Sequence, residues 1–282
     1  LAGDALTTGS DNTVLGKSAL SAGVASFYNT AIGHNALAAD TTGRLSVAVG
    51  RNALAAQNNT SSANMYNTAV GSSAGAAVTT GINNTLIGGL AGDALTDADY
   101  NTVLGFNALS ADTLGSRAVA IGFEALNDQN FTSATDSYNI AIGFNAGCKV
   151  TTGVRNTLIG SKTGDAFTDA DYNVALGYNA LTSDTLGSTS TAIGYAALET
   201  QNFTSATDSY NTAVGYNAGT AVTTGTNNTL IGGLAGDATT TGGDNVAVGH
   251  TAFGANTTGA SNVALGAFAL DANTTASNNT AV

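Results

Sequence analysis

The chain has 282 residues, of which 36 are Gly and none is Pro or Trp. Only 9% of the residues are charged, and 19 acids against 7 bases give a net charge of −12. Nucleic acid is a poor partner, because phosphate backbones are bound by rows of Lys and Arg. No apolar run approaches the roughly 20 residues of a membrane helix, so we expect no membrane contact by this segment.

A motif of the type Asn-Thr-Ala-Val-Gly recurs along the chain, and its closing glycine returns after either seventeen or twenty-one positions. Three of the shorter intervals and one of the longer make a superrepeat, which separates Gly50, Gly122, Gly194 and Gly266. Seventeen residues are too few for the paired helices of common helical repeats. The spacing predicts an all-β fold, a parallel β-solenoid of about sixteen coils that forms one continuous domain over residues 1–282. Since the chain ends within a repeat, we expect an excerpt of a longer protein.

We number each coil from the Asn of the motif. β-Branched residues cluster at positions 2–4 and Gly, Asn and Thr at the corners, as strands and turns require. This pattern predicts a first strand at positions 1–4, a Gly turn at position 5, a second strand near positions 6–10 and a turn at Thr-Thr-Gly. Position 4 is Leu, Ile or Val in all sixteen copies, and position 2 is Thr, Val or Ile. These two positions share one face of the strand, and we expect that face to point into the coil.

Position 3 lies on the opposite face of the strand and is never polar. An outer face that is apolar needs a cover, and the simplest cover is another copy of the chain. The pattern therefore predicts a homotrimer whose interface consists of small residues at position 3. These residues are Ala31, Ala48, Ala69, Ala120, Ala141, Ala175, Ala192 and Ala213.

Position 1 is Asn in thirteen of sixteen copies, and the exceptions Ser46, Ala118 and Ser190 are again one superrepeat apart. Stacked Asn side chains form amide ladders at the β spacing. We expect these residues to be structural rather than catalytic.

Every fourth coil replaces the Thr-Thr-Gly corner with a longer polar loop, at residues 57–65, 129–137 and 201–209. Loops on a rigid scaffold often carry recognition, although such loops can instead hold neighbouring subunits together. The candidate partner is a host-surface glycan or protein receptor, with the aromatic residue as an apolar platform. The candidate ligand-binding residues are Gln129, Asn130, Phe131, Thr132, Asp136, Gln201, Asn202, Phe203, Thr204 and Asp208.

Other polar and aromatic groups are better explained as structure. Aromatic residues at position 6 of consecutive coils predict stacked ladders, which stiffen a solenoid more often than they bind glycans. The pairs Asp97/Asp99 and Asp169/Asp171 have a spacing that can bind calcium, but solvated turns explain them better. His34 and His250 lie on distant coils, so they cannot act together within one chain. The sequence predicts no catalytic residues, no metal site and no cofactor.

Residues 211–218, Asn-Thr-Ala-Val-Gly-Tyr-Asn-Ala, and residues 139–146, Asn-Ile-Ala-Ile-Gly-Phe-Asn-Ala, resemble the head repeats of trimeric autotransporter adhesins. That family carries Asn-Ser-Val-Ala-Ile-Gly-type motifs on a left-handed parallel β-roll, with three chains to a head, and similar repeats occur in phage tail fibres. The resemblance implies a trimeric fibre that projects from a cell or virion surface and attaches. The coils of this chain are longer than those of the adhesins.

We therefore expect an extracellular structural or adhesive fibre segment rather than an enzyme. The alternative is a non-adhesive, self-assembling filament or sheath. Ice binding, which needs a flat array of exposed Thr, is disfavoured because the Thr of position 2 shares the face that we expect to be buried.

Overall fold

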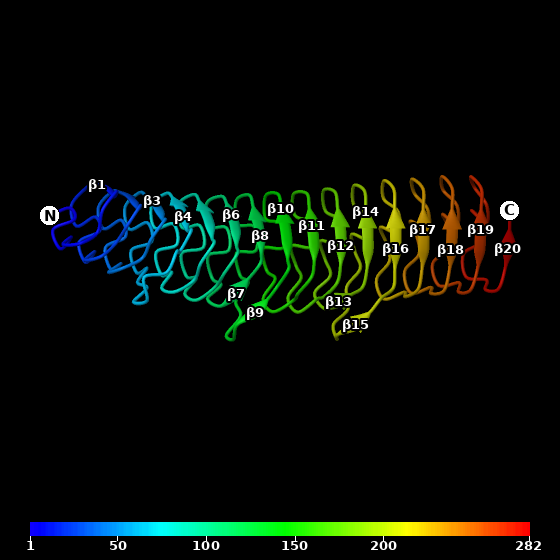
Figure 1. The fold of residues 1–282 in the computed structure, drawn as a ribbon. Helices are drawn as coiled ribbons and strands as arrows, with labels where there is room; N and C mark the ends of the chain where they lie inside the picture. Colours follow the sequence, from blue (N-terminus) through cyan, green and yellow to red (C-terminus); the bar gives the residue numbers. More distant parts are fainter. The chain divides into compact units, whose positions relative to one another are not determined.

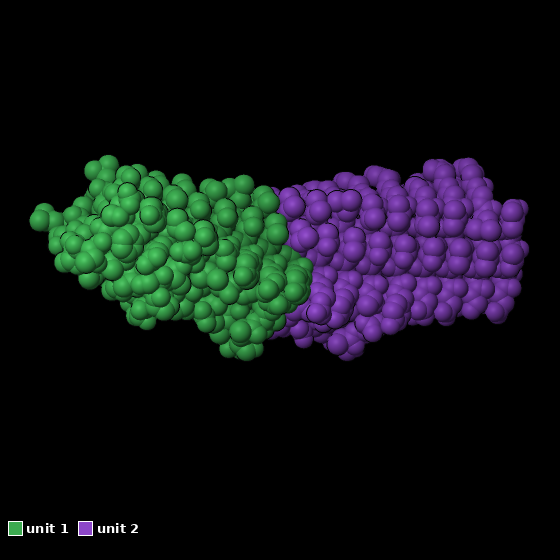
Figure 2. All heavy atoms as spheres, in the orientation of Figure 1, with its two compact units in different colours: residues 1–139 green, residues 140–282 purple.

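The computed structural model describes residues 1–282, and the chain is all-β, without helices. It forms about 16 turns of a parallel β-solenoid, which confirms the predicted fold class. The chain consists of two compact units, Leu1–Asn139 and Ile140–Val282 (Figure 2). The predicted superrepeat is present in both units. That residues 1–282 form one continuous domain stays a prediction. The chain has no helix that could cross a membrane.

In unit 1, one three-residue strand per coil pairs in parallel with the strand of the next coil, in the order β1-β2-β3-β4-β5-β6-β8 (Figure 1). The register joins identical coil positions, as in Val47 opposite Thr68 and Ala48 opposite Ala69. The short strands β7 and β9 pair separately at the insertion loop. The bounds are β1 Thr13–Leu15, β2 Thr30–Ile32, β3 Val47–Val49, β4 Thr68–Val70, β5 Thr85–Ile87, β6 Thr102–Leu104, β7 Gly115–Ser116, β8 Val119–Ile121 and β9 Thr135–Asp136.

Unit 2 repeats this arrangement in the order β10-β11-β12-β14-β16-β17-β18-β19-β20. Its surface shows rows of equivalent side chains from successive coils (Figure 2). The short strands β13 and β15 pair at the base of its insertion loop (Figure 1). The bounds are β10 Ile140–Ile142, β11 Thr157–Ile159, β12 Val174–Leu176, β13 Gly187–Ser188, β14 Thr191–Ile193, β15 Thr207–Asp208, β16 Thr212–Val214, β17 Thr229–Ile231, β18 Val246–Val248, β19 Val263–Leu265 and β20 Thr280–Ala281.

The strand faces are the reverse of the prediction. Position 3 points into the coil and is fully buried within its own chain except in the first and last copies of the motif, whereas positions 2 and 4 point outward and are half-buried or exposed. A side chain buried by its own coil cannot contact another chain, so the predicted interface at position 3 is wrong. The alanines that this finding moves into the core are Ala31, Ala48, Ala69, Ala120, Ala141, Ala175, Ala192 and Ala213.

The reason lies in how position 3 and position 9 share the narrow interior. Five coils combine Ala at position 3 with a fully buried Leu at position 9, as in Ala192 and Leu198. Where position 3 is Leu230, position 9 is Gly236, and a Cβ added there would lie 2.7 Å from the Leu230 side chain. No coil combines Leu at position 3 with Leu or Phe at position 9, as close packing of a shared interior demands.

The predicted second strand is also wrong, because positions 6–11 form turns. Positions 7 and 9 have positive φ, for example Asn35 at 57° and Leu37 at 50°. Left-handed backbone is incompatible with a strand and is strained for Leu. The next coil holds the backbone in place, since the Leu37 N–H donates to the Ala53 carbonyl at 3.0 Å.

The predicted Asn ladder is confirmed by the hydrogen bonds of the buried position 1. The Asn84 N–H donates to Asn67 Oδ1 at 2.9 Å, and the Asn101 N–H donates to Asn84 Oδ1 at 2.9 Å. The Asn84 amide also donates to the Ala98 carbonyl at 2.7 Å, which ties the strand to the far corner of its coil. Each ladder residue thus satisfies backbone groups that would otherwise be buried without partners.

The glycine that closes the motif is required by the distance between coils. At position 5 of one coil, Gly33 has a φ of 134°, and an added Cβ would lie 2.4 Å from the Gly50 carbonyl oxygen. Only Gly combines this backbone with so close an approach.

Candidate functional site

The outward face of the parallel strands is uniform in composition; we call it the sheet face and define it by positions 2 and 4. Every side chain on it is Thr, Val, Ile or Leu, and none is charged. Leu104 is 46% exposed, Leu176 41% and Ile231 38%. Exposed apolar surface of this extent marks interaction sites in soluble proteins.

The insertion loops begin with buried residues rather than exposed ones. Gln129 and Gln201 are fully buried, and Phe131 and Phe203 are each 6% exposed. The predicted role of the phenylalanines as platforms for a ligand is therefore wrong, and the two glutamines are likewise inaccessible to one. These residues anchor the loops.

The anchor is a buried carboxylate of the preceding coil. Asp112 accepts hydrogen bonds from Gln129 Nε2 at 2.6 Å, from the Phe131 N–H at 3.1 Å and from the Gly115 N–H at 3.0 Å. Burial raises the pKa of Asp112, and the bonds from Gln129 and the backbone oppose that shift. Asp184 accepts the equivalent bonds in unit 2. The sequence argument missed these aspartates, although they recur with the period of the superrepeat.

The exposed part of each loop contains the remaining candidates. Asn130, Thr132 and Asp136 are exposed in unit 1, as are Asn202, Thr204 and Asp208 in unit 2. Their predicted contact with a receptor stays a prediction.

A row formed by the last residue of each coil, which we call the position 17 row although the longer coils end at position 21, lies beside the 129–137 loop of unit 1. The guanidinium of Arg117 lies 5.0 Å from the ring centre of Tyr100 and 5.9 Å from that of Tyr138. Arg117 also forms an ion pair with Asp136. The Tyr138 hydroxyl donates to the same carboxylate at 3.4 Å. Two aromatic rings and a carboxylate thus surround one cation, an arrangement that the sequence argument did not foresee.

The predicted aromatic ladders are confirmed. Phe106 and Phe123 stack with ring centres 5.8 Å apart. Tyr195 stacks on Tyr178 and on Tyr216, with 5.4 Å between centres and 16° between planes in each pair. These side chains are 41–58% exposed, but stacked rings cover one another's faces, so a sugar ring could not insert between neighbouring rings of the ladder. Their geometry favours stiffening of the solenoid.

The paired aspartates act as acceptors for neighbouring coils. Asp97 accepts from the Thr80 hydroxyl at 2.5 Å, and Asp99 accepts from the Ile82 N–H at 2.7 Å. Burial, followed by the nearby carboxylates of Asp169 and Asp208, raises the pKa of Asp171. No group of three or more His, Cys, Asp or Glu side chains is arranged to hold a metal ion.

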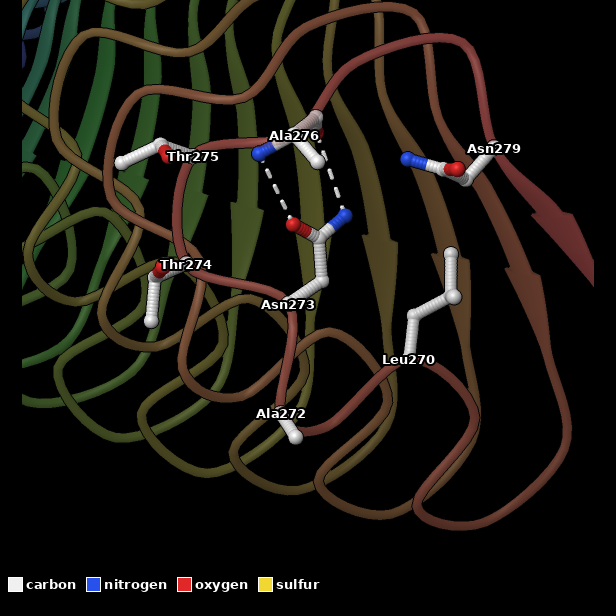
Figure 3. Close-up of a pocket in the computed structure, with 7 residues that line it drawn as sticks. All are labelled: Leu270, Ala272, Asn273, Thr274, Thr275, Ala276 and Asn279. Atoms are coloured by element: carbon white, nitrogen blue, oxygen red, sulfur yellow. Dashed lines mark hydrogen bonds between the residues drawn. The ribbon is translucent and has the colours of Figure 1, made fainter.

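One hollow of about 370 Å³ lies within the last coil and is lined by Leu270, Ala272, Asn273, Thr274, Thr275, Ala276 and Asn279 (Figure 3). Asn273 spans its corner, donating to the Ala276 carbonyl at 3.1 Å and accepting from the Ala276 N–H at 3.0 Å. The corresponding corner one coil earlier is closed by Asn256 and Gly259 in the same way. The hollow therefore has the structure of an ordinary coil corner.

No protein-family model matches the chain, and a search of curated proteins finds no match. The parallel β-solenoid is consistent with a β-roll repeat, and this is the extent to which the structure supports the resemblance to adhesin heads and tail fibres.

Proposed function

We propose that the chain is a segment of a homo-oligomeric, most simply trimeric, extracellular fibre that projects from a cell or virion and attaches to a host or other surface. The observation that carries this proposal is the sheet face, which is uncharged and partly exposed in the single chain. A second copy of the chain offers the same in-register rows of Thr and aliphatic side chains, so that identical faces can pack along many coils.

The coil construction supports a mechanical role. Each coil exchanges backbone hydrogen bonds with the next at the strand, as in the pairing of β16 with β17, and at the Asn ladder the Asn228 N–H donates to Asn211 of the preceding coil. Stability in such repeats is close to a sum of coil and neighbour terms. A chain of this kind is suited to holding attachment sites at a distance from a surface.

Sedimentation of the purified chain tests the proposal. We expect a discrete oligomer, a trimer, at micromolar concentration. Val214→Lys with Ile231→Lys places two charges on the sheet face and should yield monomers, because a buried unpaired charge is costly. Thr224→Lys with Thr241→Lys adds the same charge at an exposed corner and should leave the oligomer intact. A monomeric wild-type chain, or face variants that remain assembled with unchanged mass, would overturn the proposal.

The alternative of a non-adhesive filament or sheath makes a different prediction in the same experiment. Open-ended assembly gives a distribution of masses that grows with concentration, whereas a closed trimer gives one mass. A continuous distribution for the wild-type chain would favour the filament.

Ice binding becomes a second candidate because the ground for disfavouring it is wrong. Position 2 is Thr in ten of sixteen coils and lies on the outward face. The array is interrupted by Val47 and Val119 and is flanked by leucines of differing exposure, which favours packing against a protein partner over a flat ice plane. Thermal hysteresis is measured for the wild-type chain and for the monomeric face variant. Ice binding predicts hysteresis for the wild-type chain, whereas a protein interface predicts none for either.

A further inference from the structure

The two identical insertion loops lie beside different residues of the position 17 row. In unit 1 the central residue of the row is Arg117, between Tyr100 and Tyr138. In unit 2 the corresponding residues, each one superrepeat later, are Tyr172, Thr189 and Tyr210. The central place in unit 2 therefore has an aromatic ring on each side and no cation of its own.

The backbone that presents these side chains is the same in both units. The Arg117 N–H donates to the Asp99 carbonyl at 3.0 Å, and the Thr189 N–H donates to the Asp171 carbonyl at 3.0 Å. Both central residues have a φ of 60°. The pairing of Ser116 with Asp136 recurs as Ser188 with Asp208.

The acceptor set is also preserved. The Tyr210 hydroxyl donates to Asp208 Oδ2 at 3.4 Å, as Tyr138 does to Asp136. In unit 1 the carboxylate also pairs with Arg117. In unit 2 the shorter Thr189 directs its hydroxyl to the Ser188 carbonyl at 2.6 Å. Tyr172 and Tyr210 are 52% and 59% exposed, against 49% and 46% for Tyr100 and Tyr138.

The spacing suits a guanidinium. Tyr172 and Tyr210 belong to coils two apart, which places them about 9–10 Å apart along the ladder. Arg117 lies 5.0 Å from one ring and 5.9 Å from the other in the equivalent gap. Arg155 precedes Tyr172 in the row and lies 5.3 Å from its ring, so it neighbours Tyr172 on the side away from Thr189.

We propose that Tyr172, Tyr210 and Asp208 form a binding site for the guanidinium group of an arginine side chain presented by a partner protein. Arg117 shows how the bound group lies: it stacks between the two rings and pairs with the loop carboxylate. A planar guanidinium can stack and donate in parallel, which an ammonium cannot do. The inference is independent of the proposed fibre function.

The first superrepeat of the chain does not offer the same open place between two tyrosines. Its row consists of Tyr28, Leu45 and Tyr66, so an aliphatic side chain occupies the central place. Leu45 fills that place in the first superrepeat and Arg117 in the second, whereas the smaller Thr189 occupies it in the third.

The test is an NMR titration of the full chain, carrying ¹³C-labelled tyrosine rings, with capped arginine (N-acetyl-arginine methylamide). We expect saturable shifts of the Tyr172 and Tyr210 resonances, assigned from the Tyr172→Phe and Tyr210→Phe variants. Tyr210→Leu should weaken binding about two- to fivefold, the change expected for one cation–π contact at an exposed site. Capped lysine should bind more weakly than capped arginine.

Two exchanges between the units supply matched controls. Thr189→Arg copies unit 1 and should abolish the saturable shifts at Tyr172 and Tyr210. Arg117→Thr copies unit 2 and should create a second set of saturable shifts at Tyr100 and Tyr138. Both substitutions place a residue on a backbone that already carries it elsewhere, and circular dichroism confirms that each variant is folded. The absence of saturable shifts in the wild-type chain, shifts that persist in Thr189→Arg, or equal affinity for capped lysine would each overturn the assignment.

Discussion

The side-chain amide of Gln129 donates a hydrogen bond of 2.6 Å to the buried carboxylate of Asp112. Its oxygen accepts from the Asn139 amide at 2.8 Å, so the glutamine bridges the coils on either side. Position 1 of its own coil is Ala118, which has no amide to extend the Asn ladder. Gln129 therefore supplies the amide that this coil lacks. Gln201 does the same in the coil that begins at Ser190.

Replacing Gln129 with Ala should destabilise unit 1 substantially. The substitution removes one hydrogen-bond partner from the buried Asp112 carboxylate and one from the Asn139 amide, at a cost of about 3 kcal/mol. Thr132→Ala, in the exposed part of the same loop, should change stability by less than about 0.5 kcal/mol. Urea denaturation followed by circular dichroism measures both. Equal midpoints for the two variants would show that the buried amide is dispensable.

The sequence predicted the period and the strand because both depend on spacing. Seventeen residues leave room for one coil, and the β-branched run before Gly33 or Gly50 places the strand. It did not predict which face of the strand points inward, because position 3 and position 4 are both apolar and alternation alone is symmetrical. The decisive residues lie outside the strand: where Leu86 occupies position 3, Gly92 occupies position 9. That exchange of volumes reveals the shared interior.

The candidate site was predicted in part for a similar reason. The insertion loops stand out by length, but sequence length does not distinguish Gln129, which is buried, from Asn130, which is exposed. Position 1 lacks Asn in the same coils that hold the glutamines, as at Ala118 in the coil of Gln129. This coincidence was the signal that could have distinguished the buried Gln129 from the exposed Asn130.

Lowering the pH from 7 towards 4 should stabilise the chain against unfolding. Burial raises the pKa of Asp40 and Asp112 above the ordinary value of 3.8. An acid whose pKa is raised in the folded state binds more protons folded than unfolded, so stability falls as the pH rises from the unfolded pKa through the folded pKa. Thermal melting at a series of pH values between 4 and 7 measures this slope.

Asp112→Asn should reduce the pH dependence and keep the Gly115 bond of the corner, but its NH2 group faces the Gln129 donor and should lower stability at every pH. Asn256 already occupies the equivalent position of a later coil, where its oxygen accepts from the Gly259 N–H at 2.9 Å. Asp128→Asn removes the same charge from an exposed site and should leave the slope as it is in the wild-type chain. A slope that both variants change equally would assign the effect to net charge.

Exchanging the volumes at Leu230 and Gly236 should restore stability that either single change removes. Leu230→Ala opens a cavity and should cost about 2–5 kcal/mol. Gly236→Leu places a side chain against Leu230, since an added Cβ lies 2.7 Å from it, and overpacking costs about 1–3 kcal/mol. The double variant recreates the pairing of Ala192 with Leu198 and should recover most of the loss. Additive effects in the double-mutant cycle would contradict the shared interior.

Deleting one superrepeat within unit 2 should leave a folded solenoid, whereas deleting ten residues should not. Removal of residues 157–228 joins Asn156 to Thr229, and because Thr229-Leu230-Ile231 repeats Thr157-Leu158-Ile159, the junction keeps both the strand register and the core. Removal of residues 161–170 shifts β12 relative to β11 by ten positions, so that neither the Asn ladder nor the buried position 3 remains aligned. Repeat stability is nearly additive over units and neighbours, so the superrepeat deletion should melt cooperatively and close to the wild-type temperature. In circular dichroism, the ten-residue deletion should melt at a lower temperature and over a broader range. If it melted as sharply and at as high a temperature as the superrepeat deletion, coil register would not control stability.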